Sequence, residues 1–398
     1  NVAVTALDAT AAADFSGVNV AGTKVANVAN DVTFAGDLGG FAVVIADTKT
    51  LTSTAAKLHG LTITDAGGHT ANVVVTALDA KADADLSNVS LHASATKTAN
   101  VANDVTFTGN LGGFGVVVAN GKTLTSTSAK LDGIAVTEAV GHNATTKVSD
   151  TSISANANLS GVQTNAIAFG NGSTDITLAD GVILSIREAH LTNIVGDSGA
   201  DASIKDGSDT GHVKIYEFTG DHDLVEIDVA GNITGYVSSS QTIVGDESKI
   251  EELDALVIQS GGSLAVTQVQ ANAFATALTK EAGAGNVTST VSGDLSALNL
   301  SAVDVLTIGA DSTILVDSTA DLKAAAAINV NGKSINVNNT IDLTGKTITN
   351  YEDLTVDTNQ LTVSAEQIAG FTGGGTVSKT NGGLIKVHVG STANISSL

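Results

Sequence analysis

Short apolar runs separated by Gly, Asn and Asp recur along the whole chain. Those at residues 2–7, 41–45, 73–78 and 116–118 are three to six residues long and rich in β-branched side chains. Runs this short, bounded by turn residues, indicate β-strands, because an amphipathic helix needs an apolar stripe over about ten residues or more. The pattern predicts an all-β fold.

One-turn helices are predicted to interrupt these strands. The sequence LTSTAAKLHGLTIT at Leu51 has weaker echoes at Leu264 (LAVTQVQANAFATAL) and Leu361 (LTVSAEQIAGFTGGGTV). In each, Thr or Ser opens a helical turn that leads into a strand, and Thr267 with Gln270 has the spacing of a capping box.

The N-terminal part of the chain is an internal duplication. Residues 31–69 align without a gap on residues 104–142, and 26 of the 39 positions are identical. NVAVTALDA at Asn1 recurs as NVVVTALDA at Asn72, so the unit is 71 to 73 residues long. We predict two repeat units (1–71 and 72–146), degenerate repeats with an acidic segment (147–260) and degenerate C-terminal repeats (261–398).

Two all-β architectures fit this pattern: a parallel β-solenoid with one-turn helices, and tandem antiparallel β-sandwich domains. The solenoid is favoured because the strands are short and because none of the 398 residues is Pro. Asn also recurs, for example at Asn329 and Asn336, where stacked amides at turns would hydrogen-bond from coil to coil.

Charge and composition exclude several partners. The net charge is −23 and Arg187 is the single arginine, so there is no basic surface for nucleic acid. No apolar run approaches the roughly 18 residues that a membrane-spanning helix needs. The absence of Cys and Met suits a chain outside the cell, where oxidised side chains are not repaired. We expect an extracellular or cell-surface location.

No catalytic motif stands out. The chain has no GxSxG, P-loop or dinucleotide-binding glycine motif. His69 and His142 occupy equivalent repeat positions, whereas His59 is replaced by Asp132 in the second copy, and a catalytic residue is rarely duplicated with its scaffold. We predict that the protein is not an enzyme, and a polysaccharide-degrading activity is the less favoured alternative.

Residues 197–254 hold 14 carboxylates against three Lys. Within them, Asp206 and Asp209 lie in a Gly/Ser-rich segment, and Asp221 and Asp223 are two residues apart. Oxygen-rich segments of this kind suit calcium, so these four residues are the candidate metal ligands and calcium is the candidate cofactor. The alternative is a solvated acidic face that keeps a β-rich surface soluble.

The motifs DLSNVSL at Asp85 and DLSALNLSAVDVLTIGA at Asp294, set among Thr, Val, Ala, Asn and Gly strands, resemble those of repetitive surface-layer and adhesin proteins of Gram-negative bacteria. The resemblance implies an exported, acidic, calcium-binding protein. The chain departs from that pattern in one respect. The calcium-binding nonapeptide GGxGxDxUx is not present as a tandem array, and its nearest fragment, GNGSTDI at residues 170–176, stands alone.

Together these features predict an extracellular structural protein that assembles with copies of itself into a surface layer, sheath or filament. Copies of the chain are the expected partners, with cell-surface polysaccharide as a second. The alternative is an adhesin or carbohydrate-binding module, for which Tyr216, Phe218 and Tyr236 are the candidate contact residues.

Overall fold

A computed structural model describes the chain apart from residues 68–69, 142, 171–174, 193, 195–202, 207–209, 222–223, 225–226, 244–251, 275–276, 292–301, 309–313, 317–326, 338–340, 343–346, 358–359, 365–375, 381–383 and 389–398. The chain packs as two compact units. Unit 1 comprises Asn1–Val213 with Glu226–Gly231, and unit 2 comprises Lys214–Val225 with Asn232–Leu398. This division by packing does not test the four segments predicted from the repeats.

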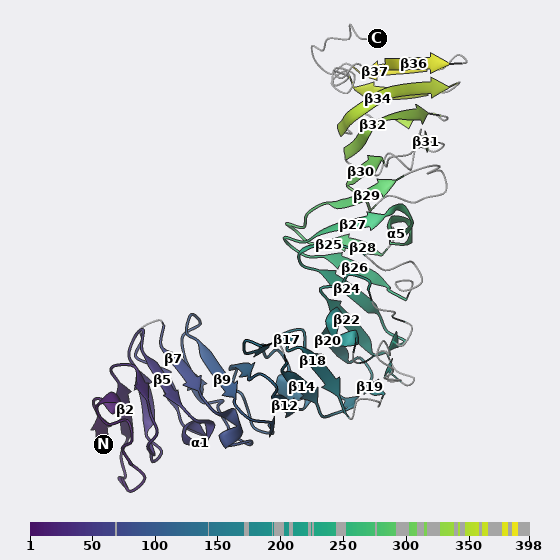
Figure 1. The fold of residues 1–398 in the computed structure, drawn as a ribbon. Helices are drawn as coiled ribbons and strands as arrows, with labels where there is room; N and C mark the ends of the chain where they lie inside the picture. The colour runs from purple at the N-terminus through teal and green to yellow at the C-terminus, as the bar shows by residue number, and fades with distance from the viewer. Residues whose placement is uncertain are drawn as a thin grey trace. The chain divides into compact units, whose positions relative to one another are not determined.

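Both units are parallel β-solenoids, which confirms the favoured prediction and rules out antiparallel sandwiches. Each strand pairs in parallel with a strand about one coil away in sequence. Val2 pairs with Lys24, for example, and Val25 with Ala42. Figure 1 shows β5, β7 and β9 lying side by side as successive coils. Parallel neighbours require a crossover connection, and here the rest of each coil provides it.

In the part of unit 1 that the structure describes, four sheets lie wholly within the unit, and a further sheet includes its strands β16 and β20. The first sheet has the order β1 (Val2–Val4), β2 (Lys24–Val28), β4 (Ala42–Ile45), β6 (Ile63–Asp65) and β8 (Val89–Ser90). The second has β3 (Val32–Thr33), β5 (Thr50–Ser53), β7 (Asn72–Val75), β9 (Lys97–Val101), β11 (Gly115–Val118), β13 (Val136–Glu138) and β17 (Val162–Gln163). The third has β10 (Val105–Thr106), β12 (Thr123–Ser126), β14 (Thr145–Val148) and β18 (Ala166–Phe169). The fourth has β15 (Ser152–Ile153), β19 (Ile176–Leu178), β21 (Ile204–Lys205) and β23 (Ile227–Asp228), and β16 (Ala157–Asn158) pairs with β20 (Ile183–Arg187).

Unit 2 continues with longer strands. One of its sheets has β24 (Ile233–Val237), β26 (Ala255–Ile258) and β28 (Leu278–Lys280). Another has β25 (Ser240–Thr242), β27 (Ser263–Thr267), β29 (Val287–Val291), β30 (Val305–Ile308), β32 (Ala327–Val337), β34 (Thr347–Asp357) and β36 (Thr376–Thr380), with β31 (Ile314–Val316) paired to β32. The remaining sheet has β33 (Ile341–Asp342), β35 (Gln360–Ser364) and β37 (Leu384–His388). The division between the units falls within β22 (His212–Tyr216).

Asn329 and Asn336 lie inside β32, so their predicted place at turns is wrong.

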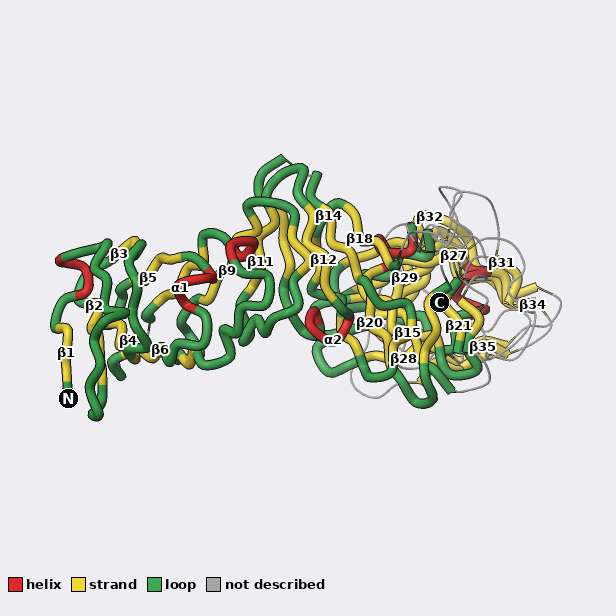
Figure 2. The backbone as a smooth tube through the Cα atoms, turned by 90° about the horizontal axis from the view of Figure 1, so that it is seen from below, coloured by secondary structure: helices red, strands yellow, loops and turns green. Residues whose placement is uncertain are grey.

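The helices are short and follow strands, as predicted. They are α1 (Ala55–Leu58), α2 (Ser128–Leu131), α3 (Glu188–Leu191) and α5 (Gln268–Ala273), with 3-10 turns at Leu7–Ala9 and Leu78–Ala80. Figure 2 shows helices only as short segments of the tube between strands and loops. Thr267 and Gln270 form the predicted capping box, with each backbone N–H bonded to the side chain of the other residue. Gln367, the corresponding residue near Leu361, lies outside the described residues.

The core fills the inside of the coils with Val, Ile, Leu and Ala side chains and with several buried phenylalanines, such as Phe34 and Phe41. Along β4 the positions alternate between half-buried and buried, and Val43 and Ile45 are fully buried. Register places Ala26, Val43 and Ile63 directly above one another on successive coils. Each inward position therefore packs against its own counterparts, which stabilises the stack by about 1.5–3 kcal/mol for each large apolar side chain buried.

Equivalent strands of the two repeat copies lie on different sides of the coil, that is, in different sheets. β1, β2, β4 and β6 of the first copy share one sheet. Their equivalents β7, β9, β11 and β13 instead continue the sheet that β3 and β5 of the first copy begin. Equivalent side chains of the two copies therefore project from different sheets.

Side-chain oxygens at the corners bind the backbone of the neighbouring coil. An Asp or Asn accepts a backbone N–H from a residue 19 to 28 positions away, at 2.6–3.2 Å. The pairs in unit 1, with the acceptor first and the donor second, are Asn1–Thr23, Asp8–Ala29, Asp31–Thr50, Asp47–Thr70, Asp65–His92, Asn72–Thr96, Asp79–Ala102, Asp104–Thr123, Asp132–Asn158, Asn156–Ile183 and Asp175–Ser203. In unit 2, Asp254 accepts from Ile233 and Asp304 from Val287. Part of the acidic composition therefore satisfies backbone donors where the strand ladders break.

We expect Gly36→Ala to destabilise unit 1 by about 2 kcal/mol. A Cβ at Gly36 would lie 1.9 Å from the carbonyl oxygen of Ala13 on the adjacent coil, and the equivalent Gly109 lies equally close to Ala84. The control is Gly17→Ala, because nothing lies within 4 Å of a Cβ placed there. Urea unfolding should show a lower midpoint for Gly36→Ala alone. Equal midpoints for both variants would contradict the close coil approach.

Candidate functional site

The four predicted calcium ligands do not all fall within the described residues. Asp206 is 5% exposed, and its Oδ2 accepts the backbone N–H groups of Gly211 at 3.2 Å and Ala230 at 2.5 Å. Asp221 lies at an exposed position, whereas Asp209 and Asp223 lie outside the described residues. Asp206 thus has the same role as the other corner carboxylates. In the part of the chain that the structure describes, no three His, Asp or Glu side chains lie close enough together to hold a metal ion.

The aromatic candidates separate into one core residue and one outward pair. Phe218 is fully buried, and its N–H donates to the carbonyl of Tyr236 at 3.0 Å. The rings of Tyr216 and Tyr236 stack at 4.8 Å between centroids and 11° between planes, and the Lys214 ammonium lies 5.9 Å from the Tyr236 ring. Burial raises the pKa of the Tyr216 hydroxyl. A stacked pair on neighbouring strands stabilises those strands, and both tyrosines are half-buried.

Sequence reasoning missed His190, a buried histidine at the third position of α3. Its Nδ1 accepts the N–H of Arg187 at 3.2 Å, and its Nε2 donates to the carbonyl of Val162 at 2.9 Å on the preceding coil. The bond that Nδ1 accepts requires the neutral ring, and burial lowers the pKa of His190 to about 4. Gln270 has the same place in α5, where it accepts from Thr267 and donates to the Ile243 carbonyl. The capping-box spacing between Arg187 and His190 was the available signal.

Several corner carboxylates are also held ionised. The side-chain hydrogen bond from Asn30 lowers the pKa of Asp8, and that from Lys205 lowers the pKa of Asp175. These shifts come from coil-to-coil bonds. Shifted pKa values in a cleft indicate a catalytic site, but the shifted pKa values here belong to carboxylates that make structural hydrogen bonds between coils.

Two hollows are lined by described residues. The smaller, about 220 Å³, lies in unit 1 beside Gln163, Asn165, Arg187 and His190. The larger, about 430 Å³, lies in unit 2 over β25, β27 and the start of β29. Only the larger falls within the range of about 300–1,000 Å³ typical of small-molecule sites.

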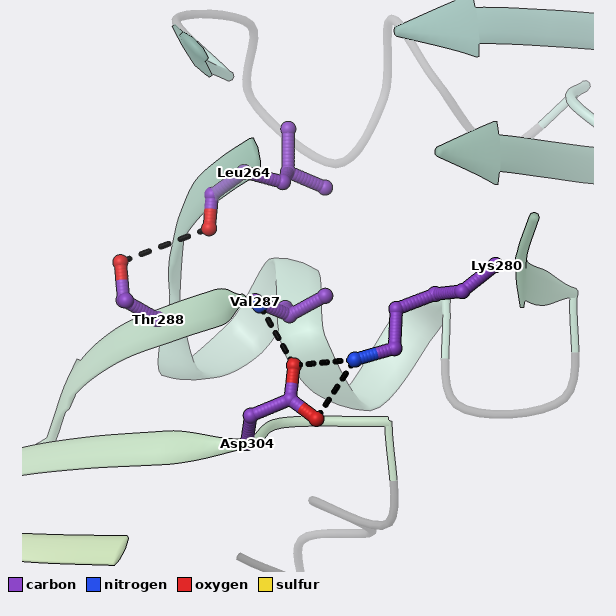
Figure 3. A network of polar contacts seen from close by, with 5 residues as sticks. All are labelled: Leu264, Lys280, Val287, Thr288 and Asp304. Carbon is purple, nitrogen blue, oxygen red and sulfur yellow. Dashed lines mark hydrogen bonds and ion pairs between the residues drawn. The ribbon is translucent and has the colours of Figure 1, made fainter. Parts of the chain in front are cut away.

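An ion pair lies at the start of β29, one of the strands that line the larger hollow. Lys280 Nζ lies 2.6 and 2.5 Å from the two carboxylate oxygens of Asp304, and Asp304 also accepts the N–H of Val287 at 2.6 Å (Figure 3). Asp304 thereby fixes the start of β29, and the paired charges largely cancel.

The comparisons with known proteins give no relative. No protein-family model, curated protein or solved structure matches the sequence. Among the described residues, no helix has the length and apolar character required to cross a membrane.

His190 should make unit 1 less stable as the pH falls from about 6.5 to about 4. Its pKa is lowered on folding, so in this window the unfolded chain binds a proton that the folded chain does not, and stability is complete only above about 6.5. The expected loss is about 3 kcal/mol. Urea unfolding at a series of pH values measures it.

The matched variants are His190→Gln and His190→Ala. Glutamine reproduces both hydrogen bonds, as Gln270 does, so we expect stability near that of the wild type at pH 7 and a shallower loss on acidification. Alanine should cost about 1–3 kcal/mol at pH 7, because it leaves buried groups unpaired. Equal pH slopes for the wild type and His190→Gln would contradict the assignment.

Proposed function

We propose that this chain is an extracellular structural protein that assembles with copies of itself into a surface layer, sheath or filament. The observation that carries the proposal is the repeated use of polar side chains, along both units, to bind neighbouring coils together. A scaffold needs a rigid stack of this kind, whereas an enzyme concentrates perturbed polar groups in one cleft. The prediction that the protein is not an enzyme remains part of this proposal.

The outward sheet faces support contacts between copies. Thr33, Thr52, Val74 and Thr98 form one register row across four strands of unit 1, and none of them is charged. Carboxylates lie instead at the corners, where they bind backbone groups. Two chains of net charge −23 repel one another least where such uncharged faces meet.

Self-association should be detectable directly. We expect sedimentation velocity to show species that grow with protein concentration, and electron microscopy to show sheets or filaments. High salt should promote assembly, because it screens repulsion between acidic chains. A strictly monomeric particle at every concentration and salt condition would refute the scaffold role.

We propose calcium as a promoter of this assembly. The 14 carboxylates of residues 197–254 repel one another at neutral pH, and cation binding would remove that repulsion. Asp209, Asp221 and Asp223 remain the proposed ligands. Asp206 would have to contribute an oxygen while its Oδ2 holds Gly211 and Ala230.

Calcium should therefore raise the melting temperature and the assembled fraction, and chelator should reverse both effects. The measurement is a thermal melt with parallel light scattering across a calcium titration. Asp221→Asn should weaken the response, while Asp83→Asn, an exposed carboxylate in unit 1 paired with Lys81, should leave it unchanged. Indifference of the melting temperature and scattering to calcium and chelator would assign the segment to a solvated acidic face.

An adhesin or carbohydrate-binding role is the second candidate, and cell-surface polysaccharide is its proposed ligand. The outward Tyr216–Tyr236 pair with Lys214 beside it is the observation that favours it. Glycan binding that is lost in Tyr216→Ala would place the role at this pair.

A further inference from the structure

We propose that the larger hollow of unit 2 is a binding groove for a neutral, hydroxyl-rich oligosaccharide lying along the coil axis. The groove has a volume of about 430 Å³. Its lining residues are Ser240, Gln241, Thr242, Ser263, Leu264, Ala265, Asn286 and Thr288. This inference does not depend on self-assembly.

The chemistry of the lining selects the ligand class. Six of the eight lining residues carry a hydroxyl or a carboxamide, and none is charged. Hydroxyls and amides both donate and accept hydrogen bonds, as sugar hydroxyls do. Each lining side chain can therefore act as donor or as acceptor toward a neutral glycan. An ionic ligand would find no counter-charge in the lining, and the nearby Lys280 and Asp304 are paired with one another.

The register of the strands sets the direction of the groove. Ser240 pairs with Ser263, and Thr242 pairs with Ala265, which in turn pairs with Thr288. Taken together, the two rows give each of the three strands at least one hydroxyl, and the strand spacing of about 4.8 Å is close to the length of one pyranose ring. An oligosaccharide along the coil axis would meet similar groups at each ring.

The floor of the groove is set by Ala265. Its methyl group lies between Thr242 and Thr288 in the register row, so the row is lowest at its centre. Ser263 Oγ donates to Ser240 Oγ at 2.8 Å, and Thr288 Oγ1 lies 3.4 Å from the Leu264 carbonyl, as Figure 3 shows. These bonds orient the hydroxyls and leave acceptor lone pairs for a ligand.

The row of hydroxyls ends at β30. Thr288 pairs there with Val305, an apolar, half-buried residue. The polar part of the groove thus spans β25, β27 and β29, which limits the bound segment to about three sugar rings at one ring per strand.

The test is saturation-transfer NMR with the full chain and neutral cello-, manno- and xylo-oligosaccharides, with oligogalacturonate as the acidic comparison. We expect at least one neutral series to bind, and affinity to stop rising beyond about three rings. Ala265→Phe should abolish binding by filling the groove. Thr242→Val with Thr288→Val should weaken it about tenfold, because two hydroxyls are lost without a change of shape.

The matched control is Thr64→Val, which removes an outward, half-buried strand hydroxyl from unit 1 and should leave binding unchanged. Circular dichroism of each variant separates loss of binding from loss of fold. The groove assignment is overturned if no neutral series binds, if the acidic series binds better, or if binding survives Ala265→Phe and the double Val variant. Binding lost in Tyr216→Ala but retained in Ala265→Phe would place the glycan on the tyrosine pair instead. Sedimentation reports self-assembly separately.

Discussion

The structure depends on satisfying backbone N–H groups at the corners of each coil. Along a parallel strand the ladder pairs every donor with the neighbouring coil, but at a corner the chain turns and the ladder breaks. Each hydrogen bond made there contributes about 0.5–1.5 kcal/mol, and a solenoid repeats its corners on every coil. Asp and Asn side chains meet this requirement by accepting the N–H from the adjacent coil, as Asp31 does for Thr50 and Asp104 for Thr123. Part of the acidic character of the chain is therefore a consequence of its architecture.

The same requirement explains which substitutions the repeats tolerate. His59 accepts the N–H of Asp85 at 2.9 Å, and its counterpart Asp132 accepts that of Asn158 at 2.7 Å. The two side chains differ in charge and shape but present an acceptor at the same point. His190 and Gln270 show a similar equivalence within their short helices, where each accepts a backbone N–H and donates to a carbonyl of the neighbouring coil. What the fold specifies at these positions is a hydrogen-bonding group in a given place, and several residue types can provide it.

Strand length, β-branching and the absence of Pro sufficed to predict the parallel solenoid, because these are local properties that every coil repeats. The capping box at Thr267 was predictable for the same reason. The coil-to-coil role of Asp206 was not, since its partner Ala230, 24 residues away, is brought to it only by the stacking of coils. The groove over Ala265 was equally hidden, because it arises from register between strands 23 residues apart. Sequence reasoning identified oxygen ligands by type, while the folded chain determines which backbone groups those oxygens already bind.

The sideways displacement of the second repeat bears on how the chain finds its register. Near-identical segments in one chain can exchange partners during folding, and parallel stacks of like sequences favour pairing between molecules. Here β1 and its copy β7 belong to different sheets, so β7 forms on β5, a strand of different sequence. Duplication has thereby lengthened the protein without giving any strand its own duplicate as a neighbour. Because equivalent strands of the two copies lie in different sheets, a strand that took its duplicate's place would lie on the wrong side of the coil. The offset therefore favours the correct order of the coils over mispairing within the chain.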